Sequence, residues 1–189
     1  MTMTTYDGMR PVVHPTAWVH PSAELLGDVE LGEHVSVWPT CVLRGDNGKI
    51  TLGARTNFQD GSIAHATLGV TTTTIGTDCT IGHRVIVHGC VVGNSCLIGM
   101  GTIILDDVEL GDWCFVGAGA LLTPGTTTQS TPASRQAVHS SNPRPNTKGS
   151  PPLRRTTVRP RRARSTMISL IVSWGMRWRP GALPTSMSS

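Results

Sequence analysis

The chain has 189 residues, only 4 % aromatic residues and 21 glycines, so it is long enough to bury a core but is not rich in helix formers. Its many threonines, valines and isoleucines favour β-structure interrupted by turns. Neither a run of about 18 apolar residues nor a signal-peptide pattern is found, so we expect a cytoplasmic protein without a membrane span.

The net charge of +4 is the average of two unlike segments. Residues 1–125 contain twelve acidic and five basic residues, a net charge of −7, whereas residues 126–189 contain eleven basic residues and no acidic one. Proline, serine and arginine concentrate in the second segment. We therefore predict an N-terminal lead-in over 1–12, one folded domain over 13–125 and a basic tail over 126–189.

The basic tail is expected to be disordered or to be the product of a reading-frame shift, because its prolines would break a helix and no acid balances its arginines. A nucleic-acid-binding arm is the competing interpretation of such a basic segment. We favour the former, and expect no nucleic-acid partner.

The folded domain is a repeat in which an aliphatic residue, often followed by glycine, recurs every six residues from Val13 to Leu122. A second position, four residues later, is small or β-branched. Two inward positions per hexapeptide are typical of an all-β fold, the parallel β-helix, in which three hexapeptides form one coil. About 18 units, or about six coils, fit this pattern. Clear examples are Ile81-Gly82, Val92-Gly93, Ile98-Gly99, Leu110-Gly111 and Val116-Gly117.

Four of the five cysteines fall on the small inward position of this repeat, and no two cysteines form a C-x-x-C pair. We expect reduced thiols that pack as small apolar groups in a reducing compartment. They are Cys41, Cys79, Cys96 and Cys114.

Three histidines stand out because the repeat predicts where they lie. His65 and His88 each follow an inward residue, and their spacing of 23 equals one 18-residue coil plus an insertion of about five residues within Thr67–Thr74. They should therefore stack on one face, one coil apart. His83 occupies another face, so a three-histidine site requires His83 from a second subunit. Three imidazoles and a water would form an open, catalytic type of zinc site.

The runs "VLRGDNGKITLGARTNFQDGSIAH", "IGHRVIVHGC", "LIGMGTIILD" and "VGAGALLTPG" resemble the γ-class carbonic anhydrase family across nearly all of residues 10–125. This resemblance implies a left-handed β-helix, a homotrimer, and Zn²⁺ at each subunit interface, with Fe²⁺ or Co²⁺ as other candidates. The ligands would be His65 and His88 of one chain and His83 of its neighbour. The tail would replace the helix with which members of the family end.

The resemblance also assigns roles around the metal. Gln59 would hydrogen-bond a metal-bound water, and Asn57 would line the pocket. An ion-pair network across the subunit contact would consist of Arg44, Asp46 and Asp60.

The activity implied is that of a lyase, the reversible hydration of carbon dioxide to bicarbonate by a metal-bound hydroxide. We expect it to be weak, because Asn47 stands where active members carry an acid and the loop after His65 has no carboxylate. Two alternatives remain open. One is a hexapeptide-repeat acyltransferase, and the other is a metal-stabilised structural trimer without catalysis.

Overall fold

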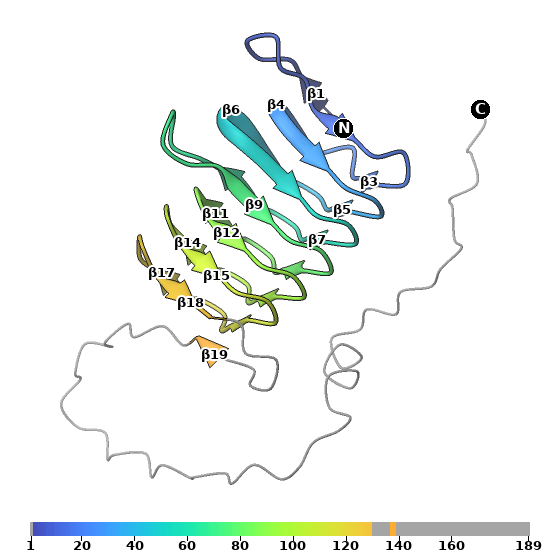
Figure 1. Cartoon of the computed structure of the whole chain (residues 1–189). Coiled ribbons are helices and arrows are strands. Elements are labelled where there is room, and N and C mark those ends of the chain that lie inside the picture. The colour runs from blue at the N-terminus through green and yellow to red at the C-terminus, as the bar shows by residue number, and fades with distance from the viewer. Residues whose placement is uncertain (1, 130–136, 139–189) are drawn as a thin grey trace, which may run out of the picture. The chain divides into compact units, whose positions relative to one another are not determined.

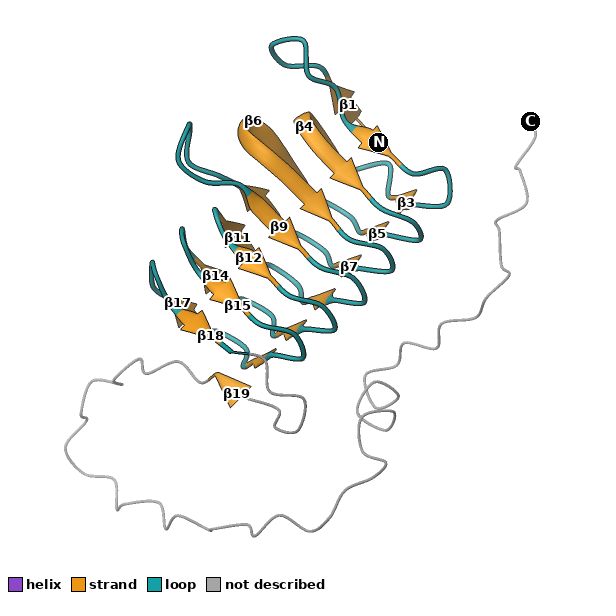
Figure 2. Cartoon of the chain, in the orientation of Figure 1, coloured by secondary structure: helices purple, strands orange, loops and turns teal. Residues whose placement is uncertain are grey.

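The computed structural model describes residues 2–129 and 137–138, and in this part of the chain every regular element is a β-strand (Figure 2). Most strands contain two or three residues, and only two exceed this length. The strands are β1 (Thr2–Thr4), β2 (Val12–Val13), β3 (Trp18–Val19), β4 (Glu24–Leu31), β5 (Ser36–Val37), β6 (Val42–Leu52), β7 (Asn57–Phe58), β8 (Ile63–His65), β9 (Thr73–Ile75), β10 (Thr80–Ile81), β11 (Ile86–His88), β12 (Val91–Val92), β13 (Leu97–Ile98), β14 (Ile103–Ile104), β15 (Glu109–Leu110), β16 (Phe115–Val116), β17 (Leu121–Leu122), β18 (Thr127–Thr128) and β19 (Ala137–Val138).

All pairings between strands are parallel, and each strand pairs with the strand one coil further along the chain (Figure 1). A seven-stranded sheet runs β19-β16-β13-β10-β7-β5-β3, which corresponds to seven stacked coils. The predicted left-handed parallel β-helix of hexapeptide repeats is confirmed, with one coil more than expected.

The other sheet folds around a corner, because β4 and β6 run through it and contribute to two faces. The first part of β6 pairs with β8, and its last part pairs with β9. We call the side formed by β8, β11, β14 and β17 the first face, and the side formed by β9, β12, β15 and β18 the second face. The seven-stranded sheet is the third face.

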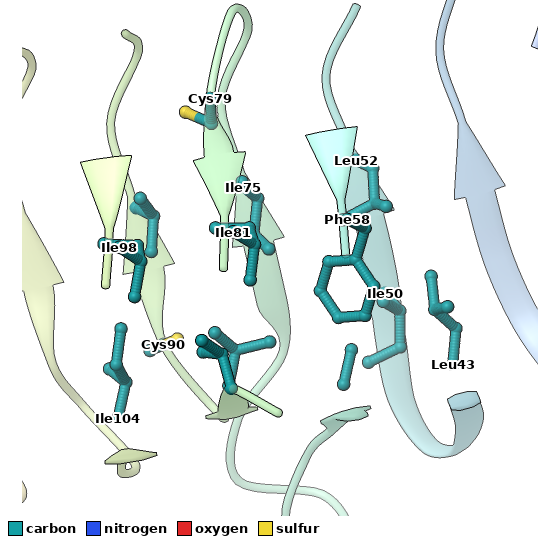
Figure 3. Close-up of a cluster of buried hydrophobic side chains, with 14 of the residues drawn as sticks. Leu43, Ile50, Leu52, Phe58, Ile75, Cys79, Ile81, Cys90, Ile98 and Ile104 are labelled. Atoms are coloured by element: carbon teal, nitrogen blue, oxygen red, sulfur yellow. The ribbon is translucent and has the colours of Figure 1, made fainter. Parts of the chain in front are cut away.

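Apolar residues at the six-residue spacing fill the interior of the coils. Phe58 and Ile81 are in register on the third face and fully buried, and Ile98 follows one coil later (Figure 3). Neighbouring residues point outward, because successive side chains of a strand alternate between its two sides. The sequence period therefore sets which side chains reach the surface of each face.

The five cysteines are buried and free, as predicted for the four at the small inward position. The fifth, Cys90, is also inside the coils, and burial raises the pKa of its thiol to about 12. The Cys90 thiol is therefore protonated at neutral pH, and the buried thiols pack as apolar groups.

The corner between the first and second faces is widened in β6. Four residues, from Asp46 to Lys49, stand where the paired segment of β4 has one, Asp28. The backbones of β4 and β6 approach closely here, and a Cβ at Gly45 would collide with the backbone of Asp28. The glycine permits this close approach, which places Asp46 and Asn47 on an outward bulge at the corner.

The repeat continues on both sides of the segment 13–125. β1 pairs with β4 at the N-terminal end, while β18 pairs with β15 and β19 with β16 after residue 125. Apart from 126–129 and 137–138, the basic tail lies outside the described residues. The domain boundaries, and the expectation of disorder or a reading-frame shift, stay predictions.

Replacing Phe58 with alanine should lower the free energy of unfolding by about 3–5 kcal/mol, because it removes the largest fully buried side chain of the core. Phe115→Ala is the control, since Phe115 faces outward and is 36 % exposed. Urea unfolding at a fixed protein concentration measures both. Equal, small losses would contradict the packing described.

Candidate functional site

The site is formed by two imidazoles on the outer side of the first face. His65 ends β8 and His88 ends β11, and the two residues are direct partners in the parallel ladder. Because the preceding Ala64 and Val87 point inward, both imidazoles point outward. Their ring centroids lie 5.0 Å apart, and His65 Nδ1 is 3.1 Å from His88 Nε2. The predicted stacking of this pair, one coil apart, is present in the structure.

A carboxylate contacts the other nitrogen of each ring. Asp46, on the bulge of β6, places Oδ1 3.0 Å from His65 Nε2, and Asp106, after β14, places Oδ1 3.1 Å from His88 Nδ1. An ionised carboxylate only accepts hydrogen bonds, so each of these ring nitrogens carries the proton. In the neutral rings, the two nitrogens that face each other are then unprotonated. Two lone pairs 3.1 Å apart repel one another and attract a proton or a metal ion between them.

Electrostatics around His65 keep its ring neutral. The pKa of His65 is lowered, mainly by burial and also by the positive charge of Arg44. Asp46 raises it, but by less than these two effects together. The guanidinium of Arg44 lies 3.3 Å from His65 Nδ1 and 2.6 Å from Asp46 Oδ2. Asn47 Nδ2 lies 3.3 Å from His65 Nε2. Because both of these nitrogens are donors when Nε2 carries the proton, the ring is held by Arg44 and Asp46 of β6.

The two carboxylates stay ionised. Burial alone would raise the pKa of Asp46, but hydrogen bonds from Arg44 and His65 outweigh it and the pKa is lowered. Burial alone would also raise the pKa of Asp106. The hydrogen bond from Thr71 and the charge and hydrogen bond of His88 outweigh burial, so this pKa is lowered. Both can therefore hold an imidazole N–H at neutral pH.

His83 lies apart from the pair, after β10 at the corner between the third and first faces. Its Nδ1 is 3.0 Å from Asp60 Oδ2, and its side chain is 44 % exposed. Among the described residues, no group of three or more histidine, cysteine or acidic side chains is placed to hold one metal ion. One chain therefore brings together two of the three predicted ligands, and the third would have to come from another subunit.

The other predicted residues divide between these two places. Arg44 and Asp46 form an ion pair beside His65, whereas Asp60 pairs with His83 and not with them. Asn57 accepts a hydrogen bond from Ser36, and Gln59 is buried next to Asp60. Within one chain, the predicted Arg44–Asp46–Asp60 network is thus two separate pairs, and a contact between subunits is untested.

Sequence reasoning missed Asp106 and the threonines that bind it. Thr71 Oγ1 donates to Asp106 Oδ1 at 2.8 Å, and Thr67 Oγ1 donates to the same carboxylate at 3.2 Å. Asp106 follows His88 by 18 residues, the length of one uninterrupted coil. Counting one coil from His88 would therefore have found it. The threonines lie in the inserted loop, whose conformation the repeat does not predict.

Comparison with known proteins agrees with this fold. Residues 89–124 match the family "Bacterial transferase hexapeptide (six repeats)". A solved hexapeptide transferase family protein from Anaplasma phagocytophilum is 38 % identical, with a TM-score of 0.66, over 73 % of this chain and 80 % of that one. A Bacillus cereus protein, provisionally assigned as an acetyltransferase, is 35 % identical, with a TM-score of 0.65, over 68 % and 74 %. The chain belongs to the hexapeptide transferase family.

Curated relatives carry the name "Carnitine operon protein CaiE". Those of Escherichia coli O7:K1 and Salmonella agona are each 43 % identical over 125 residues, or 66 % of this chain. The match spans 63 % of the length of each relative.

The solved relatives correct the activity expected from the sequence. The prediction of a carbonic anhydrase lyase is wrong, because the solved relatives at 35–38 % identity are a hexapeptide transferase family protein and a protein provisionally assigned as an acetyltransferase. The resemblance held for the fold, which these transferases share. As for membranes, the described residues form no helix long and apolar enough to cross a bilayer.

Replacing Thr71 with valine should loosen the loop after His65, because it removes a 2.8 Å hydrogen bond to Asp106 and a 3.0 Å hydrogen bond from the Thr67 amide. Hydrogen exchange measured by mass spectrometry should be several-fold faster in peptides covering residues 67–73. The matched control is Thr72→Val, since Thr72 is exposed. Identical exchange in the two variants would contradict the role of Asp106 as anchor of this loop.

Proposed function

We propose that the protein transfers an acyl group from a thioester such as acyl-coenzyme A to a nucleophilic acceptor, with the reaction centred on His65 and His88. The proposal is supported by membership of the hexapeptide transferase family and by the similarity to an assigned acetyltransferase. The observation that carries it is the orientation of the two imidazoles by Asp46 and Asp106, which leaves His88 Nε2 able to accept a proton. We expect neither nucleic acid nor a membrane as partner.

His88 is the general base of the proposed reaction. The hydroxyl or amine of the acceptor attacks the thioester carbonyl carbon, and its proton passes to His88 Nε2. The new bond to carbon forms first, and the carbon–sulfur bond breaks as the tetrahedral intermediate collapses. The coenzyme A thiolate leaves and takes the proton from His88. Asp106 stabilises the imidazolium between these steps, as the carboxylate does in an aspartate–histidine pair.

Arg44 supports this chemistry from the side of β6. The Arg44 side chain is 44 % exposed, and the contact with Asp46 fixes the guanidinium beside His65. The remaining N–H groups can bind an anionic part of the substrate, since a guanidinium has five donors. We therefore expect Arg44 to contribute to substrate binding more than to the chemical step.

The His88→Gln variant should lose at least about 100-fold in kcat, because a glutamine cannot take up the proton. Release of free coenzyme A thiol from acetyl-coenzyme A is measured with a panel of amine and hydroxyl acceptors. His14→Ala is the control, since the His14 imidazole hydrogen-bonds Thr16 at an exposed corner. Activity retained by the His88→Gln variant would contradict the proposed base.

A second candidate function, a metal centre between subunits, is favoured by one further observation. Each of His65, His83 and His88 has a carboxylate on one ring nitrogen, which is how metal-binding histidines are usually oriented. The separation of 3.1 Å between the facing nitrogens of the pair is close to the distance of about 3.3 Å between two ligands of a tetrahedral zinc ion.

Such a centre would be held by His65 and His88 of one chain and His83 of the next in a homotrimer. Zn²⁺ suits these ligands, and Fe²⁺ or Co²⁺ are the other candidates. A bound ion would polarise a carbonyl group of the substrate. His88 would then be a ligand and not a base, so the two candidates are exclusive. An inactive metal-stabilised trimer is the third candidate, in which metal is present and no acyl transfer occurs.

If the metal centre exists, His83→Ala should remove bound metal as completely as His65→Ala, although His83 is remote from the pair within one chain. Metal content of the purified protein is measured by mass spectrometry, with His14→Ala as the control. Full metal in the His83→Ala variant would exclude a site shared between subunits. Absence of metal from the wild-type protein after incubation with zinc would exclude the centre altogether.

A further inference from the structure

The loop between β8 and β9 exposes two aliphatic side chains. In the segment 66–73, the only apolar side chains larger than alanine are Leu68 and Val70, which are 69 % and 70 % exposed. Thr67 and Thr71 of the same loop are half-buried and turn toward Asp106, and Thr73, the first residue of β9, is fully buried. Leu68 and Val70 thus form a small exposed apolar surface at the tip of the loop.

The loop is also fixed to the site. Thr67 and Thr71 donate to Asp106, the carboxylate that orients His88. At its other end, Thr73 Oγ1 donates to the backbone carbonyl of His65 at 2.6 Å. The loop is therefore anchored to the site at both ends, through Asp106 at one end and through the His65 carbonyl at the other.

The turn at the tip explains the exposure of both side chains. The amides of Val70 and Thr71 both donate to the Thr67 carbonyl at 3.1 Å, and Gly69 between the apolar residues has a φ of +65°. A left-handed glycine at this point closes the turn. Leu68 and Val70, one on each side of the glycine, are presented outward by this backbone.

We infer that Leu68 and Val70 bind the aliphatic part of the acyl group, so that the protein prefers acyl thioesters longer than acetyl. This inference rests on the proposed acyl transfer. Two aliphatic side chains offer roughly 200 Å² of apolar surface, whereas a stable protein partner needs about 800 Å² on each side. An acyl chain of a few carbons matches the smaller area. Each methylene that it buries contributes about 0.8 kcal/mol, or about a fourfold preference.

The test compares the double variant Leu68→Ser/Val70→Ser with Val12→Ser, a matched loss of an aliphatic side chain that is 65 % exposed on β2. Acetyl-, butyryl- and hexanoyl-coenzyme A are compared by kcat/KM and, independently of turnover, by calorimetric binding. We expect the butyryl-to-acetyl ratio to fall about tenfold in the double variant. The Val12→Ser ratio should equal that of the wild type.

Several results would overturn the inference. Unchanged chain-length ratios in the double variant would do so, as would an equal loss for all three thioesters. A changed molar mass in light scattering, with chain preference intact, would instead identify the tip as a contact with another copy. Failure of the proposed function is separate: binding that favours longer chains without any turnover would retain the loop inference and remove acyl transfer.

Discussion

The parallel hydrogen bonding between successive coils is the constraint on which the rest of the structure depends. Each coil is held in register by backbone bonds to the next, so residues about 18 positions apart lie directly above one another. This stacking buries the aliphatic positions of the repeat and aligns the outward ones in rows. The imidazole pair is one such row, since His65 and His88 are backbone neighbours in the ladder.

Insertions at the corners turn this regular scaffold into a site. The bulge of β6 brings Asp46 to His65, and the loop between β8 and β9 brings two threonines to Asp106. The pairing resumes after each insertion: β4 and β6 pair again from Val29 and Ile50, and β8 and β11 are paired through His65 and His88. Loops of a few residues at a corner cost little conformational entropy, so corners are where this fold can acquire binding groups without loss of its core.

The sequence predicted those features that follow from the period. The β-helix, the buried cysteines and the stacking of His65 on His88 all result from counting in sixes and eighteens. The partners of the imidazoles depend on side-chain conformations at corners, which the period does not determine, so Asp106 and the inward threonines were missed. The assignment of a lyase failed for another reason: the motifs that suggested it lie on a scaffold that unrelated activities share, and fold does not determine function.

The most direct measurement of the central claim is a crystal structure of the complete protein with an unreactive acyl-coenzyme A analogue. The account predicts the carbonyl carbon of the acyl group next to His88 Nε2, with the acyl chain against Leu68 and Val70. A coenzyme bound away from the first face, with the imidazole pair unoccupied by either substrate or metal, would contradict it.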